Sequence, residues 1–231
     1  MNDHFIDIYA KHGDRYHELI AAEDIDKNLD SALFGLENFK GKRVLDLGSG
    51  TGRIPLLLKN QLSEILAIDL YASMLKEQQI HQHNVPDWEI TQADLKYLPV
   101  ESNWADVVTA GWAIGHFCSW YASTWRDEAF RAINEMERSA KPGGLLIIME
   151  TMGTGTEQAE PPTPQLAEYY QWLGKHGFML QTIRTDYEFG SVQRAVELCT
   201  FFFGDEMGEK VGANNWSRVP EWTGIWHERF F

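Results

Sequence analysis

The sequence is poor in cysteine, in cationic side chains and in long apolar runs, and each shortage argues against a class of protein. Its two cysteines, Cys118 and Cys199, lie far apart without a C-x-x-C pattern, so we expect neither a cysteine zinc site nor a disulfide framework. The longest apolar run, residues 145–149, is too short to span a bilayer. Residues 1–16 carry charges throughout and lack the apolar core of a signal peptide, so the expected location is cytoplasmic.

Positive charge is also scarce. The 231 residues include 20 Lys and Arg against 34 Asp and Glu, which gives a formal net charge of −14. Binding to nucleic acid or to an anionic membrane surface depends on cationic side chains, and no block of Lys or Arg interrupts this acidic chain. We therefore expect no nucleic-acid and no membrane partner. The expected substrate is a small molecule, no metal is expected, and the expected state is a monomer or a homodimer.

Short apolar runs alternate with amphipathic stretches in the middle of the chain. Apolar spacing predicts one helix over residues 14–39, and Gly41 ends it. Beyond it we expect strands at 43–47, 65–69, 88–93, 105–110, 144–149, 178–185 and 223–230, helices at 51–60, 71–82, 124–140, 164–175 and 192–203, and a loop at 153–164. Strands that alternate with helices in this way imply a parallel sheet whose two faces are covered by helices.

The segment RVLDLGSGTGR, residues 43–53, carries the strongest chemical signal. Gly48, Gly50 and Gly52 lie between a strand and a helix, where glycine permits positive φ and lets a ligand touch the backbone. The free N–H groups of the following helix attract an anion, here a carboxylate. Asp46, two residues before the first glycine, would repel a pyrophosphate but suits a ligand that also carries an ammonium. The motif therefore favours an amino-acid moiety over a dinucleotide.

The residues VLDLGSGTG resemble motif I of the class I S-adenosylmethionine-dependent methyltransferases. The resemblance implies an α/β fold, the three-layer αβα Rossmann-like methyltransferase fold, with a seven-stranded sheet of order 3-2-1-4-5-7-6 and strand seven antiparallel. It covers residues 40–150 well and the rest only topologically. We expect one domain over 1–231, with an N-terminal helical lid (1–40), a cofactor-binding core (41–150) and a C-terminal part (151–231).

The same resemblance implies S-adenosyl-L-methionine as the cofactor and assigns residues to it. Asp69 would accept hydrogen bonds from the ribose hydroxyls, and Asp94 would accept one from the adenine amine. Leu70 and Met74 would flank the adenine, and the backbone of Leu95 would face a ring nitrogen. The full expected set is Asp46, Gly48, Ser49, Gly50, Thr51, Gly52, Asp69, Leu70, Met74, Asp94, Leu95, Gly111 and Trp112.

His116 is the candidate catalytic base. The cofactor already activates the methyl group, so a base is needed only where the acceptor cannot lose its proton unaided. The alternative for His116 is a histidine packed at a helix start. Glu150, the other candidate base, ends the fifth expected strand on the same edge, and a solvated acid is the favoured interpretation for it.

Aromatic and histidine side chains complete the list of candidates. Tyr9 and Tyr16 lie in the expected lid and would either face the sulfonium or serve packing alone. His81 and His83 lie near a helix end, where pairing with the helix dipole is expected rather than metal binding. The tryptophans that would line an acceptor pocket or fill the core are Trp112, Trp120, Trp216, Trp222 and Trp226.

The predicted function is methyl transfer to an O, N or C nucleophile of a small molecule. A non-catalytic regulator that binds S-adenosylmethionine is an alternative, and an NAD-dependent oxidoreductase is another. Acceptor recognition is expected in the N-terminal helices and in residues 187–222, which carry no pattern that names the acceptor.

Overall fold

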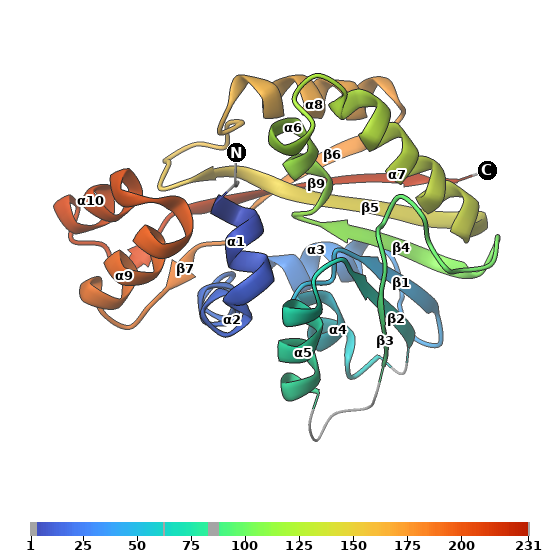
Figure 1. The fold of residues 1–231 in the computed structure, drawn as a ribbon, viewed down its shortest axis with the longest axis horizontal. Coiled ribbons are helices and arrows are strands. Elements are labelled where there is room, and N and C mark those ends of the chain that lie inside the picture. The colour runs from blue at the N-terminus through green and yellow to red at the C-terminus, as the bar shows by residue number, and fades with distance from the viewer. Residues whose placement is uncertain (1–3, 62, 83–87, 231) are drawn as a thin grey trace.

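A seven-stranded sheet runs through the computed structural model, which describes residues 4–61, 63–82 and 88–230 (Figure 1). Its strands are β1 (Arg43–Leu47), β2 (Glu64–Asp69), β3 (Glu89–Gln92), β4 (Ala105–Gly111), β5 (Ala140–Thr154), β6 (Met179–Arg184) and β9 (Glu221–Arg229). The strand order is β3-β2-β1-β4-β5-β9-β6. Strands β1 to β5 pair in parallel, whereas β9 is antiparallel to both β5 and β6. The expected sheet order and the reversed strand are both confirmed.

Helices cover both faces of the sheet, and each face has its own core. These helices are α3 (Asn28–Leu36), α4 (Arg53–Leu58), α5 (Ala72–His81), α7 (Trp125–Ser139) and α8 (Pro164–Lys175). On one face α7 and α8 bury an apolar stripe, with Ile133 and Met136 of α7 packed against the sheet. On the other face Leu33 of α3 and Leu58 of α4 do the same. The apolar faces of these helices thus cover both sides of the sheet and bury its central strands. Among the described residues, no helix is long and apolar enough to cross a bilayer.

The helix expected over residues 14–39 is wrong as a single element. The chain instead forms α1 (His4–Lys11), α2 (Gly13–Ala21) and α3. The break before α3 contains Asp24 and Lys27, whose φ angles are +61° and +56°. The carboxylate of Asp24 accepts hydrogen bonds from the first backbone N–H groups of α3, at 2.9 Å from Asn28 and 2.9 Å from Leu29. Capping of α3 by Asp24 stops the preceding helix where apolar spacing alone suggested continuity.

An insertion between β6 and β9 holds elements that the sequence analysis missed. It contains β7 (Tyr187–Glu188), the expected helix α9 (Val192–Phe203), the unexpected helix α10 (Asp205–Ala213) and β8 (Arg218–Val219). Leu198 of α9 and Val211 of α10 form a third apolar cluster with Leu19 of α2. The insertion and the N-terminal helices therefore pack on one another and together cover the carboxyl ends of the parallel strands (Figure 1).

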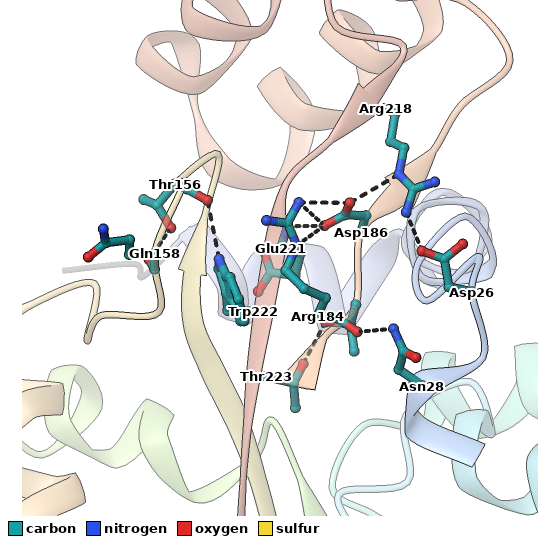
Figure 2. Close-up of polar contacts among 11 residues, drawn as sticks. Asp26, Asn28, Thr156, Gln158, Arg184, Asp186, Arg218, Glu221, Trp222 and Thr223 are labelled. Carbon is teal, nitrogen blue, oxygen red and sulfur yellow. Dashed lines mark hydrogen bonds and ion pairs between the residues drawn. The ribbon is translucent and has the colours of Figure 1, made fainter. Parts of the chain in front are cut away.

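Buried charge also connects the insertion to the N-terminal segment, as Figure 2 shows. Asp186 accepts hydrogen bonds from the guanidinium groups of Arg184, at 2.8 Å, and Arg218, at 3.0 Å. Although burial acts in the opposite direction, these bonds hold the pKa of Asp186 below its usual value. Arg218 also pairs with Asp26, and Asn28 donates to the carbonyl of Arg184 at 3.0 Å. The segment before α3 is therefore fixed to the end of β6.

Asp24→Ala is expected to lower the free energy of unfolding by about 1–2 kcal/mol. The variant loses the cap of α3 and places alanine in a left-handed conformation. Asp24→Asn is the matched control, because asparagine keeps an acceptor oxygen and tolerates positive φ, and it should retain most of the stability. Urea denaturation measures both. Equal stability of the alanine variant and the parent would contradict the capping role.

Candidate active site

The turn between β1 and α4 has no room for a Cβ at Gly48 or at Gly52. Gly48 and Gly50 have φ angles of +64° and +54°, which disfavour any other residue. A Cβ on Gly48 would lie 2.5 Å from the Cβ of Ala113, and one on Gly52 would lie 2.8 Å from Cγ of Gln78. The turn therefore brings bare backbone to the carboxyl edge of the sheet.

A cavity of about 260 Å³ opens at this edge. Of the expected cofactor residues, those that line it are Gly48, Gly50, Asp69, Leu70, Met74, Asp94, Leu95, Gly111 and Trp112. A smaller adjoining pocket is lined by Asp46, Ser49 and Thr51. Gly52 borders neither space, because it faces Gln78 at the start of α4. The structure thus brings twelve of the thirteen expected cofactor residues to two adjoining spaces.

Two of these side chains are occupied by structural contacts. The hydroxyl of Ser49 lies 3.1 Å from Oε1 of Gln78, and that of Thr51 lies 2.9 Å from Nδ1 of His17. Both hydroxyls are therefore bonded to neighbours of the turn, and both residues border the smaller pocket.

Asp46 is a buried acid with one oxygen left over. Its Oδ1 accepts a hydrogen bond from the Thr109 hydroxyl at 2.6 Å. Its Oδ2 is buried and has no hydrogen-bond partner among the described residues. Burial raises the pKa of Asp46 to about 7. An unpaired buried carboxylate is costly, and a cationic group beside it would both satisfy Oδ2 and favour the ionised form. Asp46 therefore fits the ammonium of an amino-acid moiety.

Asp69 and Asp94 follow neighbouring strands and face the larger space. Asp69 accepts hydrogen bonds from the backbone N–H groups of Gly50, at 2.9 Å, and Tyr71, at 2.8 Å. Burial raises the pKa of Asp69 to about 6, against the opposite effect of these bonds. Asp94 accepts from the backbone N–H of Lys96 at 2.9 Å. Both carboxylates are held by backbone donors at the edge where open α/β sheets bind ligands, so they fit the polar groups of a nucleoside.

A second cavity of about 590 Å³ lies beside the first, under the N-terminal helices and α9. The two cavities share Tyr9, Tyr16, Trp112 and His116. Trp112 follows β4 with a φ angle of +50°, and the guanidinium of Arg53 lies 4.2 Å from the centre of a ring of its indole. This shared wall is the place where the contents of the two cavities would meet.

His116 belongs to this wall. It ends the short helix η1 (Ile114–His116), which leads into α6 (Phe117–Trp120). Its Nε2 lies 2.8 Å from the hydroxyl of Tyr9 on α1, and its ring stacks on Trp120 with 4.8 Å between centroids. Tyr16 is half-buried and packs edge-on against Tyr9 with 5.4 Å between ring centroids, and burial raises the pKa of its phenol, so Tyr16 stays neutral. The N-terminal helix and the loop after β4 therefore meet through a histidine–tyrosine pair.

Glu150 differs from the favoured interpretation of a solvated acid. It lies inside β5, is 4% exposed and lines the second cavity. Its Oε1 accepts a hydrogen bond from the backbone N–H of Gly115 at 2.7 Å, and burial raises its pKa to about 8. The error arose because β5 continues to Thr154 instead of ending at the sheet edge.

The remaining candidates divide between cavity, core and surface contacts. Trp112 and Trp120 line the first cavity, whereas Trp226 is buried in the core. Trp216 and Trp222 line none of the cavities described here. His81 stacks on His17 and lies 2.9 Å from Glu77, and His83 lies outside the described residues. Among the described residues, no group of three metal-ligating side chains is present.

Three charged residues of the second cavity were missed by the sequence analysis: Glu23, Arg53 and Glu221. Arg53 and Glu23 form a buried ion pair at 2.7 Å, although they are 30 positions apart. Glu221 lies on β9 and accepts from the Thr151 hydroxyl of β5 at 2.7 Å. No local sequence pattern identifies these residues, because their hydrogen-bond partners lie far away in the sequence and are brought close only by the fold.

Sequence comparisons agree with this geometry. Residues 45–148 match a family model described as a methyltransferase domain. A demethylmenaquinone methyltransferase of Lactiplantibacillus plantarum is 31% identical over 136 residues, which is 56% of this chain and 50% of that protein. A malonyl-[acyl-carrier protein] O-methyltransferase of Enterobacter lignolyticus is 31% identical over 125 residues, or 53% of this chain and 44% of that protein. The chain thus spans about half the length of the curated relatives it matches.

Solved structures share the fold. A protein from Bacillus halodurans superposes with a TM-score of 0.56 at 18% identity, and the match covers 87% of this chain and 97% of that protein. A SAM-dependent methyltransferase from Aquifex aeolicus gives a TM-score of 0.56 at 16% identity, with 94% and 99% covered.

The segment matched by the family model contains β1 to the middle of β5, with the glycine turn, Asp46, Asp69 and Asp94. These residues line the first cavity and its adjoining pocket, at the carboxyl edge of a sheet in methyltransferase order. Residues 45–148 are therefore similar to a methyltransferase domain, and the fold is one that solved S-adenosylmethionine-dependent methyltransferases share.

Proposed function

We propose that this protein transfers the methyl group of S-adenosylmethionine to an O, N or C nucleophile of a small-molecule acceptor. The observation that carries the proposal is the wall of Tyr9, Tyr16, Trp112 and His116 shared by two cavities. Transfer between two molecules requires that they lie side by side in a fixed orientation, which accounts for about 7–11 kcal/mol of a barrier. A protein that only senses the cofactor has no need of the second, larger cavity.

The first cavity and its adjoining pocket suit the cofactor in three places. Asp46 would hold the ammonium, Asp69 the ribose hydroxyls and Asp94 the adenine amine. When bound, the cofactor supplies a methyl group activated by a sulfonium. The free oxygen of Asp46 and the missing Cβ of Gly48 are the structural features that support this fit.

His116 would take the proton of an acceptor that cannot lose it unaided. It lies on the shared wall, and its Nε2 is within hydrogen-bond distance of the Tyr9 hydroxyl. Tyr9 belongs to α1, so the same contact helps the N-terminal helices to close the cavity and exclude water. The names of several curated relatives, among them demethylmenaquinone methyltransferase, support a small-molecule acceptor.

Calorimetry separates the proposal from its alternatives. Binding of S-adenosylhomocysteine without binding of NAD is expected, and the reverse would establish a dinucleotide site. Release of S-adenosylhomocysteine in the presence of a panel of small metabolites would exclude a purely regulatory protein. Cofactor binding without turnover of any acceptor would favour the regulator.

Affinity for S-adenosylhomocysteine is expected to rise about tenfold between about pH 6 and pH 8. The ligand's ammonium requires an ionised Asp46, and the pKa of Asp46, raised by burial to about 7, makes its carboxylate more abundant as pH rises through this window. Asp46→Asn should weaken binding and flatten the pH profile. Asp127→Asn, at an exposed position of α7, is the control and should keep the parent profile. An unchanged slope in Asp46→Asn would refute the assignment.

His116→Gln is expected to lower kcat about 10²–10⁴-fold with the first acceptor that the panel identifies. Affinity for S-adenosylhomocysteine should stay within about twofold of the parent, since glutamine keeps a polar side chain at the wall. Tyr9→Phe should shift the pH dependence of kcat without abolishing activity. If His116 serves only to stack on Trp120, His116→Gln will change thermal stability and leave the pH profile of kcat as it was.

A further inference from the structure

We propose that the second cavity takes an acceptor with an amine on an apolar body, and that Glu150 supplies the counter-charge for its ammonium. The inference rests on the proposed function and names the acceptor class of the same site. It comes from the walls of the cavity and from the charges that face it.

Eight of the 24 residues that line the second cavity are aromatic, among them Phe5, Tyr9, Trp112, Tyr187, Phe202 and Phe203. The faces of such rings carry negative partial charge, so they attract ammonium groups and gain nothing from carboxylates or phosphates. An apolar body with a cationic group fits these walls.

The charged side chains of the cavity are three glutamates and one arginine. The charge of the arginine is offset by Glu23, which Arg53 pairs with at 2.7 Å through Nη1, although its Nη2 has no hydrogen-bond partner among the described residues. Glu150 and Glu221 have no ion pair with a cationic side chain among the described lining residues. Three acids against one arginine leave the cavity with an excess of negative charge, which favours a cationic acceptor over an anionic one.

Glu150 lies where the counter-charge is needed. Its hydrogen-bond donor is the backbone N–H of Gly115, the residue before His116 of the shared wall. The titratable groups around it are Cys118, Tyr169 and Tyr170, and burial raises the pKa of each, so all three stay neutral. Without a cation nearby, burial keeps much of Glu150 protonated at neutral pH. A bound ammonium would favour its ionised form.

Glu221 reinforces the negative character of the cavity. It is 2% exposed, and its Oε2 is buried without a hydrogen-bond partner among the described residues. Burial and the neighbouring Glu23 raise its pKa, and only Arg53 among its charged neighbours opposes them. Its position is rigid, because its backbone N–H donates to Asp186 at 3.1 Å in the network of Figure 2 and its carbonyl accepts from Thr185 at 2.9 Å.

The same arrangement accounts for the proton that an amine must lose. An ammonium has no lone pair, so it must give one proton to a base before its nitrogen can attack. Glu150 would hold the ammonium as its counter-charge, and His116, the base of the proposed function, would accept that proton, which converts the ammonium to a neutral amine with a free lone pair and the imidazole to an imidazolium.

Three matched probes test the inference on the complex with S-adenosylhomocysteine: 2-phenylethylamine, the neutral 2-phenylethanol and the anionic 3-phenylpropanoate. Calorimetry at pH 7 should show the amine binding at least about tenfold more tightly than the alcohol, and no binding of the carboxylate. In buffers of different ionisation enthalpy, amine binding should release up to about one proton, since the carboxyl of Glu150 ionises.

Glu150→Gln should weaken the amine at least about tenfold and leave the alcohol within about twofold. Glu209→Gln, at an exposed position of α10, is the matched control and should bind all probes like the parent. Equal affinities for the three probes, preference for the carboxylate, or amine binding by the parent without proton release would overturn the inference. That last measurement holds even if Glu150→Gln does not fold. Failure of S-adenosylhomocysteine itself to bind would instead refute the proposed function.

Discussion

The arrangement of the whole site depends on carboxylates that the fold buries at the carboxyl edge of its sheet. Asp46 is held by Thr109 on one side and left open on the other, next to a turn that has no room for a Cβ at Gly48. Removing such an acid from water is costly, and no cationic side chain of the part of the chain that the structure describes pairs with Asp46 to offset the cost. The turn and the acid are therefore complementary to a ligand with both charges, which is what separates this edge from a phosphate-binding one.

Buried carboxylates also line the second cavity, where their surroundings differ from those of Asp46. Glu150 is also buried without a cation among the described residues, and Glu221 is near only Arg53, which Glu23 already pairs, but both acids share their cavity with aromatic side chains instead of a glycine turn. Between the two cavities stand His116 and Tyr9, joined by a hydrogen bond. Burial of acids thus prepares two adjoining spaces, and the surroundings of each acid determine what it can bind.

The elements that could be predicted are those determined by residues close to one another in the sequence. The strands up to β5 and the glycine turn follow from apolar runs and short spacings, whereas the sheet order and the choice of Asp69 and Asp94 came from the family resemblance. The break before α3 was missed because a single capping carboxylate outweighed a continuous apolar pattern. The charges of the second cavity were missed for another reason: Glu221 and its partner Thr151 are 70 positions apart, and only tertiary contact pairs them.

The backbone hydrogen bonds of residues 22–25 determine which end of the N-terminal helices is held firmly. The backbone N–H groups of Asp24 and Ile25 donate to Thr185 and Asp186, and that of Glu188 donates to the carbonyl of Ala22. Backbone hydrogen bonds thus hold the segment after α2 against residues 185–188, at the start of the insertion. In contrast, α1 is held by side-chain contacts such as that of Tyr9 with His116. If these helices move, the backbone bonds at residues 22–25 would hold that end in place, and an incoming molecule would enter under α1.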